Sequence, residues 1–325
     1  RQIRDLRISV TDRCHFRCFY CLPNGEPPMA RKDTLLTFEE IEQASEIFVS
    51  LGIEKIRLTG GEPMLRRGIE SLIASLAGLK RESNGFTDIA LTTNGFSIAE
   101  KAVALKSAGL DRLTISLDSL DKENFKDITG VDKLEEVLEA ITAAKVAGLD
   151  PVKLNAVIVR GRNESELVDF ARFARDQGVS MRLIEFMPLD AGHEWKRDMV
   201  VSGKEMFETI NAAFPLELKN QSRGGETAWN YRIKGSERGE IGIIAPVTQM
   251  FCGACSRIRL TADGQIRTCL FSNVEHNLRD VIRSGASRDE IVEFIRGVTF
   301  TKEASHNIND DEFVQPDRTM SFIGG

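Results

Sequence analysis

The sequence predicts an α/β fold with a parallel sheet, because strand-like and helix-like segments alternate along most of the chain. Up to about residue 213, short apolar segments are separated by segments with the helical spacing of apolar residues. Six β-α units imply right-handed crossovers, and they are too few for the eight-fold barrel. The alternation alone leaves a doubly wound sheet and an open six-stranded barrel as alternatives.

The expected strands are short and mainly apolar: Leu6–Val10, Lys55–Thr59, Ile89–Thr93, Arg112–Leu117, Lys153–Val159 and Met181–Phe186. The expected helices are the amphipathic segments between and after them: Phe38–Leu51, Ile69–Leu79, Ile98–Ala108, Lys133–Ala147, Glu164–Asp176 and Lys204–Ala213. Thr37-Phe-Glu-Glu40 is typical of a capping box at the start of the first helix. Glycines at positions 52, 109, 148 and 178 fit helix ends.

After about residue 214 the pattern changes, so we expect a first domain over residues 1–213 and a smaller module over residues 214–325. Arg257–Leu260 and Gln265–Leu270 flank Ala262-Asp-Gly264, which predicts a β-hairpin. Two helical segments follow, near Asn277–Arg283 and Arg288–Arg296. The hairpin would bring Cys269 back to Cys252 and Cys255.

The composition excludes several classes of protein. A net charge of −6 argues against general nucleic-acid binding, although a local basic pocket could still bind a small polyanion. The chain contains no apolar run long enough to span a membrane. Its first residues have no signal-peptide character, but they lack a start Met, so a removed leader stays open. Reduced thiols favour a cytoplasmic location, or an organelle if a leader was removed.

The six cysteines form two triplets with none left over, Cys14-x3-Cys18-x2-Cys21 and Cys252-x2-Cys255-x13-Cys269. Three thiolates around a four-iron cluster leave one iron free to bind a small molecule. We therefore predict two open [4Fe-4S] clusters, one on each triplet. A structural zinc site is the alternative for either triplet, and His15 could supply the fourth ligand at the first. A disulfide framework is disfavoured, because such frameworks belong to short secreted chains.

The first triplet, with Tyr20 before its last cysteine, resembles that of the radical S-adenosylmethionine (SAM) enzymes. The resemblance implies that the cluster on Cys14, Cys18 and Cys21 binds SAM and cleaves it reductively to a 5′-deoxyadenosyl radical. It also implies the fold: a partial (βα)6 TIM-like barrel and a smaller C-terminal module that carries the second Fe–S cluster and closes the open side of the barrel.

Parallel β/α barrels carry their functional residues at the carboxyl ends of the strands. Thr59-Gly-Gly-Glu-Pro63 lies at one such end and resembles the GGEP motif of the radical SAM family. The resemblance implies that Gly61, Ser116 and Met187 contact SAM, with Tyr20 beside it. For each of these residues, an ordinary strand-end turn or a capped strand end is the alternative.

Basic residues interrupt the apolar strands at Arg7, Arg57 and Lys153, and Arg257 and Arg259 lie two apart on one face of the predicted hairpin. Buried charges require anionic partners. A triphosphate would serve, and pairing with internal acids such as Asp111 or Glu185 is the alternative. The sequence contains no Walker P-loop, so phosphate recognition would depend on these side chains.

Cys252-Gly-Ala-Cys-Ser-Arg-Ile-Arg259 and the terminal Gly324-Gly325 pair are similar to the GTP 3′,8-cyclases, a family of radical SAM lyases. The resemblance implies conversion of GTP to (8S)-3′,8-cyclo-7,8-dihydroguanosine 5′-triphosphate, the first step of molybdenum cofactor (molybdopterin) biosynthesis. It implies that the 5′-deoxyadenosyl radical takes the ribose 3′ hydrogen, that C3′ then attacks C8, and that the second cluster binds guanine. The implied GTP contacts are Arg7, Arg57, Thr92, Lys153, Arg257, Ile258 and Arg259. The implied catalytic set is Cys14, Cys18, Cys21, Arg257, Arg259, Gly324 and Gly325.

The same resemblance implies the partners. They are GTP, an electron donor such as a flavodoxin or ferredoxin, and the next enzyme of the molybdopterin pathway, with no nucleic acid and no membrane; a homodimer is left open. Two other functions are alternatives. One is a different radical SAM enzyme with an auxiliary cluster, such as a peptide modifier. The other is a non-catalytic electron carrier or metal-binding module.

Overall fold

The computed structural model describes residues 2–22, 29–83, 85–190, 193–316 and 318–324. Six parallel strands lie side by side in sequence order, with no reversal of strand order among them. They are β1 (Asp5–Ser9), β2 (Lys55–Thr59), β3 (Asp88–Thr93), β4 (Arg112–Ser116), β5 (Lys153–Ile158) and β6 (Ser180–Glu185). The predicted partial barrel is therefore confirmed. A doubly wound sheet, in which the strand order reverses, is not formed.

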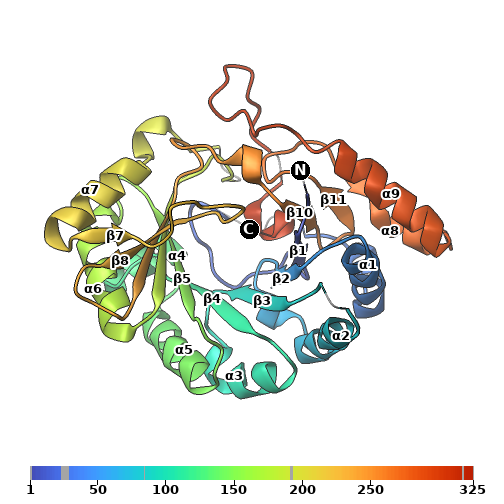
Figure 1. The fold of residues 1–325 in the computed structure, drawn as a ribbon, viewed down its shortest axis with the longest axis horizontal. Helices are drawn as coiled ribbons and strands as arrows, with labels where there is room; N and C mark the ends of the chain where they lie inside the picture. The colour runs from blue at the N-terminus through green and yellow to red at the C-terminus, as the bar shows by residue number, and fades with distance from the viewer. Residues whose placement is uncertain (1, 23–28, 84, 191–192, 317, 325) are drawn as a thin grey trace.

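The helices cover the outer side of the curved sheet, and the strands surround its centre (Figure 1). They are α1 (Phe38–Ser50), α2 (Ile69–Glu82), α3 (Ile98–Ser107), α5 (Leu134–Val146), α6 (Leu167–Gln177) and α7 (Gly203–Ala213), whereas α4 (Lys122–Thr129) is not part of this outer ring (Figure 1). The capping box of α1 is formed by Thr37 and Glu40 as predicted. The sequence pattern missed α4, which precedes α5 in the β4–β5 crossover.

The alternation within each strand explains both the core and the lining of the barrel. In β1, Leu6 and Ile8 are fully buried in the main hydrophobic core, whereas Arg7 between them points to the opposite face. The helices pack their apolar faces on the outer side, as Ile41, Ile47 and Phe48 of α1 do. The inner face is thereby left for polar side chains.

The chain beyond residue 213 extends both edges of the sheet. At one edge, β9 (Glu240–Ile244) pairs in parallel with β6 and is followed by β8 (Trp229–Ile233) and β7 (Leu216–Leu218). At the other edge, β10 (Arg257–Leu260) pairs in parallel with β1, and β11 (Gln265–Arg267) and β12 (His276–Asn277) follow. The predicted hairpin is confirmed, although its second strand is shorter. The division near residue 213 stays a prediction, because residues on both sides of it share one sheet.

The remaining helices are α8 (Leu278–Arg283), α9 (Arg288–Phe300) and α10 (Met320–Ile323), and α9 packs against α1. Short 3-10 turns occur at Lys32–Thr34, Pro63–Leu65, Glu164–Glu166, Arg197–Met199 and Cys252–Ala254. None of the helices in the described ranges combines the length and apolar character that crossing a bilayer requires.

Candidate active site

One cavity, of about 310 Å³, brings the two cysteine triplets together. Cys14, Cys18 and Cys21 line it from the loop after β1, and Cys252, Cys255 and Cys269 line it from the segments around the β10–β11 hairpin. Gly61, Thr92 and Ser116, at or just beyond the carboxyl ends of β2, β3 and β4, also line it, as the barrel architecture predicts. None of the six cysteines, all of which lie in the described ranges, takes part in a disulfide, so a disulfide framework is not formed.

The first cysteine loop is held by its own backbone and by its neighbours. The amide of Cys21 donates to the Cys18 carbonyl at 2.9 Å, and Arg17 Nη1 donates to the Cys14 carbonyl at 2.6 Å. The amide of Arg17 donates to the carbonyl of Thr129 at the end of α4 at 2.8 Å. The helix that the sequence pattern missed therefore supports this loop.

The chemistry of the first triplet fits an iron–sulfur cluster. Burial raises the pKa of Cys14 to about 11 and that of Cys21 to about 12, and it also raises the pKa of Cys18 well above its usual range. Thiols in such a setting stay protonated unless a cation holds them as thiolates. Asn94 lies close enough to donate to the Cys14 sulfur, at 3.9 Å.

The Gly60-Gly61 pair lies against the backbone of this loop. The Gly61 amide donates to the Thr11 carbonyl at 2.7 Å, and a Cβ on Gly61 would lie 2.2 Å from the Arg13 carbonyl oxygen. Only glycine permits this approach. Glu62 accepts hydrogen bonds from Thr93 Oγ1 at 2.7 Å and the Asn94 amide at 2.7 Å, and thereby ties this turn to the end of β3.

Tyr20 is oriented by an acid that the predicted site did not include. Its hydroxyl donates to Asp118 Oδ2 at 2.6 Å, and Asp118 Oδ1 accepts from the Val157 amide at 2.9 Å. Burial raises the pKa of Asp118 to about 6. Ser116 and Met187, the other predicted SAM contacts, line the same cavity. The position of Asp118 directly after β4 was the signal in the sequence.

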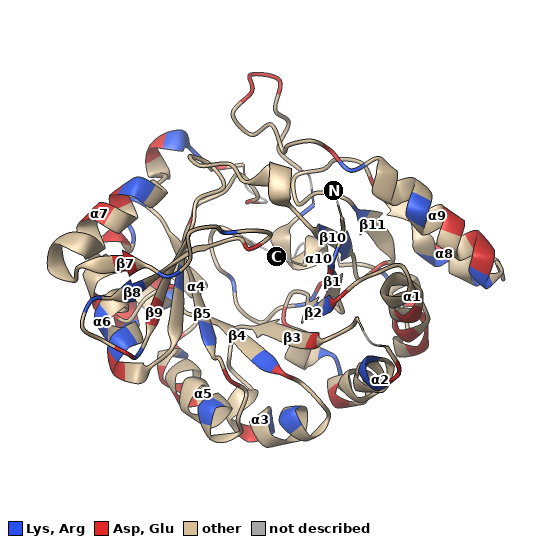
Figure 2. Ribbon diagram, in the orientation of Figure 1, with Lys and Arg blue, Asp and Glu red and all other residues tan. Residues whose placement is uncertain are grey.

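Three arginines lie in register on adjacent strands. Arg7 of β1 is paired with Arg57 of β2 on one side and with Arg259 of β10 on the other, so their side chains share one face. All three, with Thr92 and Arg257, line the cavity. Arg57 Nη1 donates to Thr92 Oγ1 and Thr114 Oγ1, each at 3.0 Å. Basic residues lie on several of the strands around the barrel centre, whereas the helices carry both charges (Figure 2).

Two predicted GTP contacts lie apart from this row. Lys153 lines an adjoining cavity toward the amino ends of the strands, and this cavity shares Arg7, Arg57 and Arg257 with the first. Ile258 is buried in the main core, so only its backbone is available to a ligand in the cavity.

The basic residues are held close to one another, and the nearby acids Asp5, Asp88 and Glu226 offset only part of the resulting repulsion. Burial and neighbouring guanidinium groups lower the pKa of Arg7 to about 10 and that of Lys153 to about 7. No carboxylate in the described ranges lies within ion-pair distance of Arg7, Arg57 or Lys153. Such a group of charges is suited to bind a polyanion.

The internal acids that could have paired with these residues are engaged elsewhere. Asp111 pairs with Lys80 at 2.6 Å, and Glu185 accepts from the Gly203 and Val247 amides at 2.8 and 2.7 Å. The pairing alternative through these two acids is therefore wrong. Arg182 also lines both cavities and was missed, although it interrupts an apolar strand as Arg7 does.

The second triplet lies in basic surroundings. Burial alone would raise the pKa of Cys255, but Arg257 and Lys302 outweigh it and lower that pKa. Burial raises the pKa of Cys269. Within the part of the chain that the structure describes, no three Cys, His, Asp or Glu side chains converge on one ion. A structural zinc site requires four ligands, whereas three thiols along a cavity wall are a ligand set that a larger cluster can use.

The end of the chain reaches this site. Met320 and Ser321 line the cavity, and the Gly324 carbonyl accepts a hydrogen bond from Arg259 Nη1. Gly324 has a φ of 77°, and a Cβ there would lie 2.4 Å from Thr59 Oγ1. Gly325 lies outside the described residues. At Gly324, both the backbone conformation and the space therefore require glycine.

Comparison with known proteins identifies the family. Residues 8–174 match the model of the radical SAM superfamily, and residues 179–308 match that of Molybdenum Cofactor Synthesis C. The chain is 45% identical over 330 residues to a GTP 3′,8-cyclase of Corynebacterium glutamicum (strain R), covering 100% of this chain and 88% of the relative. It is 43% identical over 327 residues to a GTP 3′,8-cyclase of Streptomyces coelicolor, covering 100% of this chain and 94% of the relative.

Solved structures agree in fold. Streptococcus suis SuiB bound to S-adenosylmethionine matches with a TM-score of 0.64 at 14% identity, over 91% of this chain and 68% of that chain. Methylornithine synthase (PylB) matches with a TM-score of 0.51 at 19% identity, over 66% of this chain and 63% of that chain. At such identities the likeness shows the fold alone. The sequence comparisons go further: the chain belongs to the radical SAM superfamily and, within it, to the family of the GTP 3′,8-cyclases.

Proposed function

We propose that this chain is a GTP 3′,8-cyclase that converts GTP to (8S)-3′,8-cyclo-7,8-dihydroguanosine 5′-triphosphate, the first step of molybdenum cofactor biosynthesis. The observation that carries the proposal is the single cavity that both cysteine triplets and the arginine row line. Membership of the GTP 3′,8-cyclase family gives the reaction class. A metal-binding or electron-carrying module would not require a basic cavity of this kind.

As a radical SAM enzyme, the protein uses SAM and an iron–sulfur cluster. We assign this cluster to Cys14, Cys18 and Cys21, and we assign a second [4Fe-4S] cluster to Cys252, Cys255 and Cys269. When bound, these groups supply a 5′-deoxyadenosyl radical at one end of the cavity and an open iron for the guanine base at the other. Tyr20, Gly61, Ser116 and Met187 would hold SAM, with Tyr20 fixed by Asp118.

The protein's own task is to hold both ends of GTP. The reaction joins C3′ of the ribose to C8 of guanine, so the two atoms must be kept in one geometry. Arg7, Arg57, Lys153, Arg257 and Arg259 would anchor the triphosphate. Arg259 is buried and the other four are half-buried, which limits the access of water and would strengthen each charge-assisted hydrogen bond to phosphate. Thr92 keeps Arg57 aimed into the cavity.

The remaining roles extend from this site. We propose that the Gly324-Gly325 tail takes part in turnover from beside Arg259. We further propose a flavodoxin- or ferredoxin-type electron donor, transfer of the product to the next enzyme of the pathway, and a cytoplasmic location.

The test is anaerobic reconstitution followed by iron, sulfide and zinc analysis and an assay with SAM and GTP. We expect about eight irons per chain, 5′-deoxyadenosine, and the cyclised nucleotide. Stoichiometric zinc at the second triplet would contradict the two-cluster assignment. SAM cleavage without any conversion of GTP would instead favour another radical SAM reaction, such as peptide modification.

A further inference from the structure

We propose that Arg318 is a positioning residue that, through ion pairs with Asp263 and Glu275, holds the C-terminal tail in the active site. Residues 318–324 are here called the tail segment. The part of this proposal that concerns turnover rests on the proposed function. The part that concerns docking of the tail stands on geometry alone.

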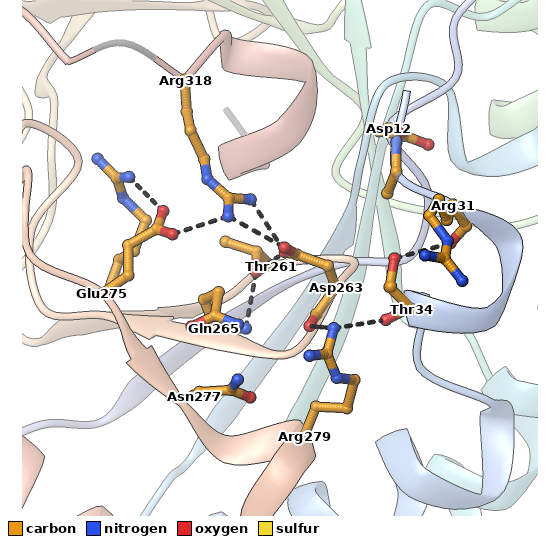
Figure 3. Close-up of polar contacts among 12 residues, drawn as sticks. Asp12, Arg31, Thr34, Thr261, Asp263, Gln265, Glu275, Asn277, Arg279 and Arg318 are labelled. Carbon is orange, nitrogen blue, oxygen red and sulfur yellow. Dashed lines mark hydrogen bonds and ion pairs between the residues drawn. The ribbon is translucent and has the colours of Figure 1, made fainter. Parts of the chain in front are cut away.

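The ion pairs converge on one guanidinium group. Arg318 Nη1 and Nη2 donate to the two carboxylate oxygens of Asp263, each at 3.0 Å, and Nη2 also lies 2.8 Å from Glu275 Oε2 (Figure 3). The bidentate geometry restrains both the position and the direction of the Arg318 side chain. The exposed fractions of the three side chains are 28%, 13% and 19%, so the network is better shielded than an ordinary surface pair.

Both acids are held in place by contacts with other side chains of the β10–β12 region. Asp263 lies in the turn between β10 and β11, where Thr261 Oγ1 donates to its Oδ1 at 2.6 Å. Glu275 accepts at 2.6 Å from Arg267, whose side chain is 2% exposed. Burial alone would raise the pKa of Asp263, but the hydrogen bonds from Arg318 and Thr261 lower it. Because β10 also carries Arg259, this anchor and the tail's contact in the site share one hairpin.

On the other side of the network, Arg318 is connected directly to the end of the chain. Its guanidinium carbon lies 4.9 Å from the centre of the Phe322 ring. The next residue, Thr319, is the N-cap of α10, and Gly324 after α10 accepts from Arg259 Nη1. Arg318 and Arg259 therefore hold the tail segment at its two ends.

The tail segment needs such an anchor because it has little stability of its own. α10 has 4 residues, far fewer than an isolated helix requires in water. Residues at a chain end remain mobile unless they are tied down. Without Arg318, only the contacts of α10 and Gly324 with the barrel would keep the tail docked.

The direct test measures docking without any turnover. Carboxypeptidase digestion of the reconstituted protein, followed by intact mass, reports how fast Gly325 and Gly324 are released. We expect Arg318→Ala to speed release by about ten- to a hundredfold, since charge-assisted hydrogen bonds are lost. The release rate of Arg318→Lys should lie between those of the wild type and Arg318→Ala, because lysine keeps the charge but not the bidentate geometry.

Arg283→Ala is the matched control. Arg283 makes a similar two-nitrogen ion pair with Glu40, from α8 to α1, and it does not contact the tail segment. This variant should release the two glycines at the wild-type rate. Equal release rates for wild type and Arg318→Ala would overturn the proposal, as would equal acceleration by the control.

The rate of GTP cyclisation gives a second, independent test. Arg318→Ala should lower kcat for GTP cyclisation by about tenfold or more and leave KM for SAM unchanged. In a chain that lacks Gly324 and Gly325, Arg318→Ala should have no further effect, because it acts only through the tail. A further loss there would show a general structural role. If the wild type cyclises no GTP but Arg318 still protects the tail, the proposed function fails and the docking role survives.

Discussion

The two cysteine triplets line the same cavity, but they differ in their electrostatic surroundings at one position, Cys255. At the first, burial raises the pKa of all three thiols, and Asp118 adds to the rise at Cys18 and Cys21. At the second, Arg257 and Lys302 lower the pKa of Cys255 against its burial. The difference arises because Cys255 of the second triplet lies beside Arg257 and Lys302.

The two loops also differ in how tightly they are packed. A Cβ added to Gly61 would lie 2.2 Å from the carbonyl oxygen of Arg13 in the first loop, whereas one added to Gly253 in the second would meet no atom within 4 Å. The first loop is thus fixed by the barrel itself. The second has space around its turn.

Removing one ligand from each triplet should give the largest effects and separate their roles. We expect Cys14→Ala to abolish both SAM cleavage and GTP cyclisation, because the first cluster loses a protein ligand. We expect Cys252→Ala to abolish cyclisation while SAM cleavage continues. Each variant should retain about four irons. The amounts of 5′-deoxyadenosine and of cyclised nucleotide formed by each variant are the measurements. Complete loss of SAM cleavage in Cys252→Ala would contradict the assignment of separate roles to the two triplets.

The glycine pair tests the difference in packing. Gly61→Ala should lower the free energy of unfolding by about 1–3 kcal/mol and reduce the iron held by the first triplet, because the added methyl group overlaps the Arg13 carbonyl. Gly253→Ala should stay within about 0.5 kcal/mol of wild type. Thermal unfolding and iron content are the measurements. Equal tolerance of both substitutions would contradict the assignment of the rigid loop.

Arg257→Ala should weaken GTP binding by about ten- to a hundredfold and leave SAM binding nearly unchanged, because one charge-assisted contact to phosphate is lost. Arg223→Ala is the control. Arg223 stacks on Phe251 at 4.4 Å, as Arg257 does at 5.4 Å, but it does not line the cavity. Its removal should change GTP affinity by only about twofold. Equal losses for both ligands in Arg257→Ala would indicate a structural role.

The smallest effect concerns pH. Without GTP, Lys153 loses its proton above about pH 7, because burial and nearby arginines lower its pKa to about 7. A bound triphosphate raises that pKa again, so binding takes up a proton, and affinity should decline severalfold from pH 7 to 8.5. Titration calorimetry in buffers of different ionisation enthalpy measures the number of protons that are taken up when GTP binds.

Lys153→Arg should remove this pH dependence, since arginine stays charged. In the GTP-free protein, the stability of the fold depends on pH in the opposite direction from the affinity for GTP. Lys153 binds its proton more tightly in the unfolded chain, so its contribution to stability rises with pH between about 7 and 10.5. An affinity for GTP that does not change across this range would show that Lys153 does not meet the phosphates.

Local patterns determined much of this protein in advance. Short apolar segments that alternate with amphipathic ones predicted β1 to β6, and the basic residues that interrupt three of them, Arg7, Arg57 and Lys153, predicted inward charges because side chains alternate across a strand. Cys14, Cys18 and Cys21 lie within eight consecutive residues, and Gly60 and Gly61 are adjacent, so each of these motifs was readable from its own short segment of the sequence.

Tertiary structure alone decided the rest, because those features join residues far apart in the chain. β9 and β10 complete the sheet at opposite edges and thereby place Cys252 and Cys255 opposite Cys14. Asp118 reaches Tyr20 across 98 positions, and Arg318 reaches Asp263 across 55. The sequence of each segment does not name the distant partner that its residue contacts. Only folding brings the partners within hydrogen-bonding distance, and the low dielectric of the protein interior then strengthens the hydrogen bonds between them.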